Sequence, residues 1–139
     1  MNKQTKNDAP LVVAYHADCI DGLACAWGVH KKFPGRETVY VPISHHDHEA
    51  GEKAVLAALK PGSELFYVDA APERAFLDKL AQLNISAITV IDHHLSTHKD
   101  LAGYVAPAGT NTIVKVITND DHPSAASMVW DYLLGSKNK

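Results

Sequence analysis

One stretch of the sequence, residues 87–94, constrains the fold more than any other. It reads Ala-Ile-Thr-Val-Ile-Asp-His-His, so a run of apolar and β-branched residues ends in a carboxylate and two imidazoles. A short, nearly continuous apolar run bounded by polar residues is typical of a parallel strand that is buried on both faces. Open α/β sheets bind their ligands just beyond the carboxyl ends of such strands. The stretch therefore predicts a buried strand that carries ligating side chains at its carboxyl end.

The rest of the chain repeats this strand pattern with helical segments in between. Apolar runs and helical spacing predict these further elements: strands over residues 11–15, 38–43, 64–68 and 111–118, and helices over residues 22–33, 49–59, 73–83 and 124–134. Pro42 indicates that the second strand lies at an edge or has a bulge near its end. Trp27 and Trp130 are expected in the core. The alternation predicts an α/β fold, a doubly wound, mainly parallel five-stranded sheet with helices on both faces.

Length and composition fit one globular domain. The chain has 139 residues, of which 46% are hydrophobic and 21% charged, and a net charge of -3 that provides no basic surface for long nucleic acid. We expect a single domain over residues 10–135, between a disordered N-terminal tail, 1–9, and a C-terminal tail, 136–139. No apolar run reaches the roughly 18 residues of a membrane helix, and the polar N-terminus does not resemble a signal peptide. Cys19 and Cys25 are expected to be reduced, so the chain is expected to be cytoplasmic, with no membrane partner.

Ionisable residues follow three of the predicted strands. They are His16, Asp18 and Asp21 after the first strand, Asp69 after the third, and Asp92, His93 and His94 after the fourth. Because the carboxyl ends of parallel strands share one edge, we expect these side chains to converge. A mixture of carboxylates and imidazoles favours Mn²⁺ or another borderline divalent ion over a Cys-rich structural zinc. Asp69, expected on a strand between the other two groups, is well placed to bridge two ions.

Phosphoester or phosphoanhydride hydrolysis is the reaction that best uses such a site. Two metal ions activate a water and neutralise charge on the phosphoryl oxygens, and a histidine beside a ligand histidine can bind phosphate or protonate the leaving oxygen. The segment from His45 to His48 follows the second strand, and it is either a solvated loop or a contact for substrate phosphate or an extra metal. Cys19 is expected to pack near the site rather than to act as a nucleophile.

Four segments, in this order, resemble the motifs of the DHH phosphoesterases. They are residues 15–26 with a His-x-x-Cys-x-Asp-Gly pattern, 68–72, the Asp-His-His triplet within 90–94, and 124–126. The resemblance covers nearly the whole chain. It implies a Mn²⁺-dependent phosphoesterase, with two metal ions per chain and Mg²⁺ or Co²⁺ as substitutes. The implied substrate is a short oligonucleotide, a nucleotide or another small phosphate ester or anhydride.

The resemblance also implies a role for each motif residue. The implied metal ligands are His16, Asp18, Asp21, Asp69 as the bridge, Asp92 as a ligand or an orienting group, and His93. The implied catalytic residue is His94, which would face the phosphate. The candidates for substrate binding are Gly22, His46 and Ser124. In this motif one residue is inserted between the two acids, Asp18 and Asp21, relative to the common form of the family.

Family members usually carry a further Asp after the triplet and a C-terminal substrate-binding domain. The sequence ends at Lys139, so we expect a DHH domain alone, with Asp120 or Asp121 as candidates for the further acid. A non-catalytic nucleotide- or metal-binding protein derived from the same core is the alternative, and a truncated enzyme is a third interpretation. A homodimer in which a second subunit supplies a residue is also left open.

Overall fold

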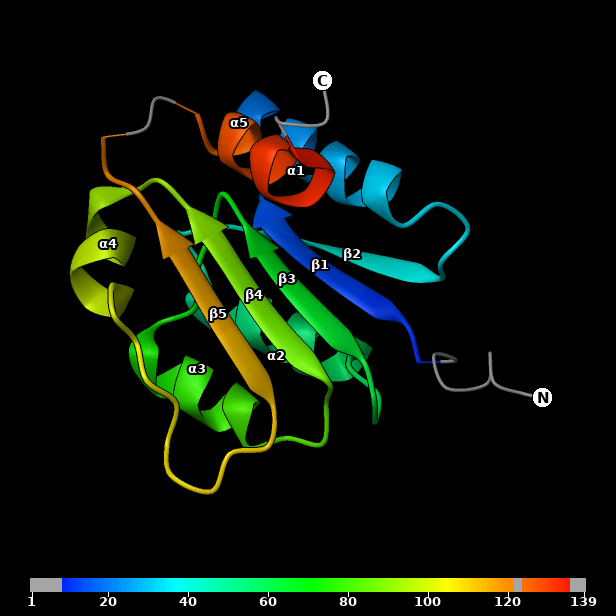
Figure 1. The fold of residues 1–139 in the computed structure, drawn as a ribbon, viewed down its shortest axis with the longest axis vertical. Helices are drawn as coiled ribbons and strands as arrows, with labels where there is room; N and C mark the ends of the chain where they lie inside the picture. Colours follow the sequence, from blue (N-terminus) through cyan, green and yellow to red (C-terminus); the bar gives the residue numbers. More distant parts are fainter. Residues whose placement is uncertain (1–8, 122–123, 136–139) are drawn as a thin grey trace.

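The computed structural model describes residues 9–121 and 124–135, in which strands and helices alternate along the chain (Figure 1). The strands are β1 (Leu11–His16), β2 (Thr38–Ile43), β3 (Glu64–Val68), β4 (Ala87–Asp92) and β5 (Ile113–Thr118). The helices are α1 (Ile20–Lys32), α2 (His48–Ala58), α3 (Arg74–Ala81), α4 (Leu95–Leu101), α5 (Ala125–Trp130) and a π-helical turn, η2 (Asp131–Gly135). The predicted tails, 1–9 and 136–139, fall outside the described residues except for Ala9.

The five strands form one all-parallel sheet in the order β2-β1-β3-β4-β5. This confirms the predicted doubly wound α/β fold, and β2 lies at an edge, the first of the two possibilities that Pro42 indicated. The chain runs from β1 outward to β2 and then returns past β1 to β3. The strand order therefore reverses between β1 and β3, which is the switch point where doubly wound sheets bind ligands.

Alternate strand residues pack against helices on opposite faces of the sheet. Val12, Leu65 and Ile88 belong to a buried cluster that includes residues of α2 and α3, whereas Leu11 and Phe66 belong to a second cluster with residues of α1 and α5. Figure 1 shows these two helix pairs on opposite sides of the strands. Burial on both faces explains the nearly unbroken apolar runs of the central strands.

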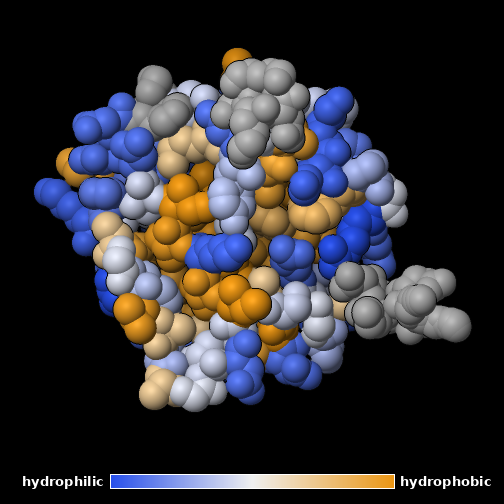
Figure 2. Space-filling model, viewed as in Figure 1, coloured by the Kyte–Doolittle hydropathy of each residue, from blue (hydrophilic) through white to orange (hydrophobic). Residues whose placement is uncertain are grey.

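The two helix layers do not cover the sheet completely. On the sheet face where α1 and α5 pack, Figure 2 shows hydrophobic residues at the surface, near the amino ends of the strands. Ile113 of β5 and Tyr132 of η2 are exposed there, beside a cavity of about 210 Å³. No helix among the described residues is long and apolar enough to cross a membrane.

The structure differs from the predictions about helices at three points, of which the last helix differs only in its type over the final turn, since α5 and η2 together span the predicted residues 124–134. The sequence did not predict α4, because its seven residues bury only Thr97 and Leu101 and show little apolar periodicity. The last helix ends at Trp130 and continues as a π-helical turn. Trp27 lies outside the core, because the inner face of α1 is formed by small residues that let α5 approach. A Cβ on Gly28, for example, would lie 2.8 Å from Nε1 of Trp130.

Candidate metal centre

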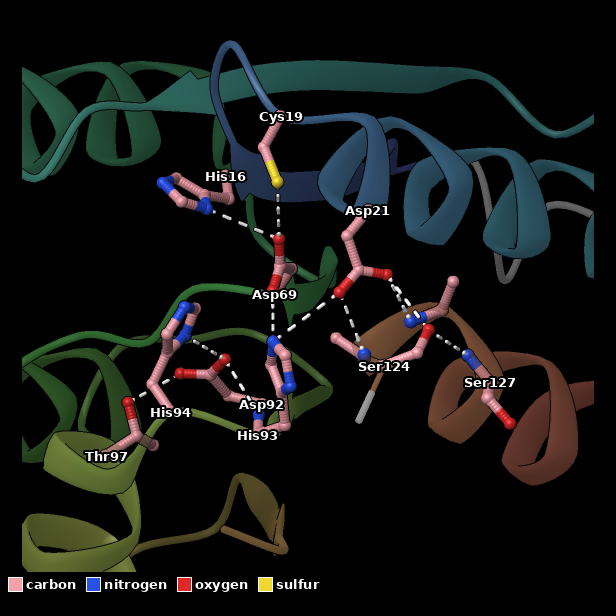
Figure 3. A network of polar contacts seen from close by, with 12 residues as sticks. His16, Cys19, Asp21, Asp69, Asp92, His93, His94, Thr97, Ser124 and Ser127 are labelled. Atoms are coloured by element: carbon pink, nitrogen blue, oxygen red, sulfur yellow. Dashed lines mark hydrogen bonds and ion pairs between the residues drawn. The ribbon is translucent and has the colours of Figure 1, made fainter. Parts of the chain in front are cut away.

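Asp69 stands at the switch point, directly after β3. Its side chain is 1% exposed, and its backbone N–H continues the ladder by donating to the carbonyl of Ile91 at 2.9 Å. Its φ of 58° is left-handed, which is uncommon for a residue with a Cβ and is typical of functional sites. A strained backbone at Asp69 therefore holds its carboxylate between the ends of β1 and β4 (Figure 3).

The two oxygens of Asp69 face two different groups of side chains. Oδ2 lies 3.3 Å from Nδ1 of His16 and 3.5 Å from Sγ of Cys19, whereas Oδ1 lies 3.2 Å from Nε2 of His93. The ligand atoms of His16, Cys19 and Asp69 are close enough together to hold one ion. Those of Asp69, Asp92, His93 and His94 form a second such group. Asp69 is the residue that the two groups share, and together we call them the Asp69 cluster.

Asp92 ends β4 and is 1% exposed, but its carboxylate is fully engaged by neighbours in the chain. Oδ1 accepts hydrogen bonds from the backbone N–H of His93 (2.9 Å) and from Nδ1 of His94 (2.7 Å), and Oδ2 accepts one from the hydroxyl of Thr97 (2.6 Å). A carboxylate that accepts from a histidine Nδ1–H fixes the tautomer and leaves Nε2 for a ligand or substrate. This geometry suits Asp92 for orienting His94 better than for binding an ion directly.

Asp21 lies in the first turn of α1 and connects that helix to α5. Its carboxylate accepts hydrogen bonds from the backbone N–H groups of Ala125 (3.0 Å) and Ala126 (2.8 Å) and from the Ser124 hydroxyl (3.2 Å). It also lies 3.5 Å from Nε2 of His93. Ser124 in turn caps α5 by accepting from the N–H of Ser127 at 3.2 Å. Asp21 thus lies beside the Asp69 cluster without belonging to either ligand group, and Ser124 bonds to Asp21, so that both residues anchor α5.

Three other candidate residues have structural explanations of their own. Asp18 is exposed in the turn after β1 with a φ of 55°, and it belongs to neither ligand group. Gly22 is needed for close packing, because a Cβ there would lie 2.3 Å from the carbonyl oxygen of His16. His46 packs its ring against His45 with centroids 4.6 Å apart, and it does not line the cavity described next.

A cavity of about 240 Å³ opens over the Asp69 cluster. Besides Asp69, Asp92 and His94, its walls include His16, His45 and His48. Nε2 of His16 and Nδ1 of His45 are 3.3 Å apart. The sequence left open whether the segment from His45 to His48 is a solvated loop or part of the site. Since His45 and His48 line the cavity, the structure favours the second interpretation for these two residues. Thr97 was missed because it lies on the unpredicted α4.

The electrostatics of Asp69 suit a bound cation. Burial, followed by the charge of Asp21, raises the pKa of the Asp69 carboxyl, and Asp92 adds to this, while His94 and His16 act in the opposite direction. Within the described residues, Oδ1 of Asp69 is buried and accepts no hydrogen bond of good geometry, although Nε2 of His93 lies 3.2 Å away. Buried polar atoms of this kind are rare in proteins and call for a partner. A divalent cation would satisfy Oδ1 and offset the clustered negative charge.

The ligand types narrow the choice of ion. Carboxylates and imidazoles together with one thiol suit borderline divalent ions, of which Mn²⁺, Co²⁺ and Zn²⁺ are examples, better than Ca²⁺. No protein family matches the chain, and no curated protein sequence matches it. What the site can do therefore follows from its own residues.

Proposed function

We propose that the protein is a phosphoesterase of the DHH type that depends on a divalent metal, Mn²⁺ in the first instance. Its substrate would be a short oligonucleotide, a nucleotide or another small phosphate ester or anhydride. The observation that carries this proposal is the shared position of Asp69, with one oxygen toward His16 and Cys19 and the other toward His93. A carboxylate between two ligand groups is the arrangement that a two-metal hydrolytic site requires. The free thiols of Cys19 and Cys25 support a cytoplasmic location.

The residues around the cavity divide the work of hydrolysis between them. His16, Asp69 and His93 would hold the metal, which supplies an activated water and neutralises charge on phosphoryl oxygens. His94, oriented through its Nδ1 by Asp92, would use Nε2 to protonate the leaving oxygen. His45 and His48 line the same cavity and would bind phosphoryl oxygens there.

Metal analysis combined with a hydrolysis screen tests this proposal. Protein purified without chelator should contain a divalent ion, and with Mn²⁺ it should hydrolyse at least one of pApA, AMP or pyrophosphate, with loss of activity in EDTA. His93→Gln should lose metal and activity, since its Nε2 faces both Asp69 and Asp21.

The matched control is His98→Gln on α4. The ring of His98 bonds the Thr118 hydroxyl at 2.8 Å and belongs to neither ligand group, so this variant should keep both metal and activity. Full activity in His93→Gln, or metal-free protein that hydrolyses substrate at the normal rate, would contradict the proposal.

A second candidate function is binding of a nucleotide or metal without turnover. The observation that favours it concerns the further acid expected after the triplet. Asp120 and Asp121 are exposed, the N–H of Asp121 closes a turn onto Asn119, and neither acid belongs to a ligand group. Tight binding of AMP and Mn²⁺ by calorimetry, with no product from any substrate of the screen, would decide for this candidate.

A further inference from the structure

Helix α1 is apolar on two sides, although only one side packs in the core. Cys25, Ala26 and Val29 form its buried side. Its other side carries Ile20 and Trp27, which are 87% and 56% exposed, with Leu23 between them at 62%. Helices that are apolar all round are normally buried, and large exposed apolar patches mark binding sites. The outer side of α1 therefore has a surface that the core does not explain.

This surface is one wall of a groove between α1 and the edge strand β2. The groove has a volume of about 700 Å³, and its walls include Tyr15, Ile20, Leu23, Trp27, His30 and Tyr40. We call it the α1–β2 groove. Tyr40 pairs in register with Val13, which packs in the core on the α1 side, so Tyr40 lies on that same face of the sheet. The groove exists because α1 packs over β1 and β3 and leaves this face of β2 open.

The side chains of the groove suit a flat, uncharged ligand. The rings of Trp27 and His30 stack with centroids 5.3 Å apart and planes inclined by 28°, and the Tyr40 hydroxyl lies 3.4 Å from Nδ1 of His30. Among the described residues, no Asp, Glu, Lys or Arg lines the groove. A mostly apolar groove with a few polar atoms, within the range of about 300–1,000 Å³, is typical of small-molecule sites. Exposed aromatic rings are the side chains on which nucleobases stack.

The groove and the Asp69 cluster are joined through the start of α1. Tyr15 of the groove precedes His16, and Ile20 of the groove lies between Cys19 and Asp21. Figure 3 shows Cys19 and Asp21 extending from this same connection toward Asp69 and His93. The same β1–α1 connection thus supplies a wall of the groove and two side chains, Cys19 and Asp21, that contact residues of the Asp69 cluster.

We propose that the α1–β2 groove binds the base of a nucleotide or short oligonucleotide whose phosphate lies at the Asp69 cluster. This inference rests on the proposed function and narrows it, because pyrophosphate and polyphosphate have no part that would fill an aromatic groove. Trp27 is the main stacking surface, since it combines the largest ring with high exposure. His30 and Tyr40 provide the polar atoms at the edge of the base.

Calorimetric titration with two probes tests the groove directly. The probes are AMP and ribose 5-phosphate, which share the sugar phosphate and differ by the base, each with Mn²⁺ and with a check that no probe is consumed. The wild-type chain should bind AMP roughly tenfold more tightly than ribose 5-phosphate, which is within the range for stacking of one base. Trp27→Ala should remove this preference without changing the affinity for ribose 5-phosphate, and Trp27→Phe should keep most of it.

The matched control is Leu56→Ala on α2, which removes another exposed apolar side chain on a helix of the opposite face and should leave both affinities unchanged. Equal affinities for the two probes in the wild-type chain, or an unchanged preference in Trp27→Ala, would overturn the inference. So would sedimentation of the wild-type chain as a dimer that Trp27→Ala converts to a monomer, because a second copy would then occupy the groove.

These titrations, together with the hydrolysis screen, distinguish failure of this inference from failure of the proposed function. A base preference that depends on Trp27, without hydrolysis of any phosphoester, would support the groove and contradict the hydrolase. Hydrolysis of pApA and pyrophosphate with no effect of Trp27→Ala would support the hydrolase and contradict the groove.

Discussion

Two buried carboxylates at the ends of neighbouring strands, Asp69 after β3 and Asp92 at the end of β4, are satisfied in different ways. Both are 1% exposed. Asp92 accepts three hydrogen bonds, all from residues 93–97. Asp69 has a raised pKa and, within the described residues, an oxygen that accepts no hydrogen bond of good geometry. A buried carboxylate whose hydrogen bonds all come from the next few residues of the chain serves to orient those neighbours, whereas one that is only partly hydrogen-bonded and faces histidine and cysteine side chains is suited to bind a cation.

The largest expected effect is that of Asp69→Asn. The amide keeps the shape but loses the charge that the two ligand groups share, so metal content and Mn²⁺-dependent hydrolysis should fall at least about 100-fold, since even partners outside the ligand shell are often worth 10–100-fold. The metal-free variant should also be more stable than the metal-free wild type, because ionised Asp69 is unfavourable in the fold. Activity assays and thermal unfolding in EDTA measure the two effects, with exposed Asp131→Asn as the control. If metal-free Asp69→Asn were less stable than the metal-free wild type, Asp69 would stabilise the fold as Asp92 does, and the proposed difference between the two carboxylates would be wrong.

Asp92→Asn should change stability in the opposite direction. An amide group cannot accept all three hydrogen bonds, and its N–H₂ would face donors from His93, His94 or Thr97. We expect the free energy of unfolding to fall by about 1–3 kcal/mol, the usual effect of an unsatisfied buried group. Denaturant unfolding in EDTA measures this, and unchanged stability would mean that these hydrogen bonds do not hold the end of β4.

Thr97→Val isolates one of the three hydrogen bonds to Asp92. The variant keeps the side-chain shape and removes the 2.6 Å bond, so the free energy of unfolding should fall by about 1 kcal/mol. Thr110→Val is the control, because the Thr110 hydroxyl is buried without a hydrogen-bond partner among the described residues. The control should be neutral or slightly stabilising. Equal losses in the two variants would indicate an effect of the substitution itself.

The smallest expected effect is a difference in pH dependence. Because the pKa of Asp69 is raised in the fold, its ionised form destabilises the metal-free protein at neutral pH. As the pH falls through that raised pKa, the folded protein takes up a proton before the unfolded chain does, and this destabilisation is lost. The stability advantage of Asp69→Asn over the wild type should therefore shrink as the pH falls from 7 toward the pKa of an unfolded Asp. An advantage that grows on acidification would show that the pKa of Asp69 is lowered instead.

Much of the fold was accessible from the sequence because its strands are marked locally. The predicted bounds of β2 and β3 agree with the structure, and those of β1, β4 and β5 differ by one or two residues. Helix α4 was not accessible, because a short crossover helix that buries few residues has almost no apolar pattern. Trp27 was misplaced because helical spacing identifies a face of a helix but does not say which face the core covers.

Some features of the candidate site could likewise be predicted from the sequence, whereas others could not. The sequence by itself determined that His16, Asp69 and the Asp92 to His94 triplet lie at strand ends on one edge of the sheet, since an apolar run followed by polar residues is a local signal. Only the tertiary structure decided that Asp69 faces two ligand groups, that Asp21 holds α5 across 103 residues of sequence, and that β2 leaves a groove beside α1. These features depend on strand order and on which helices cover which face. Such relations are set by packing between distant segments, and no local pattern of residues specifies them.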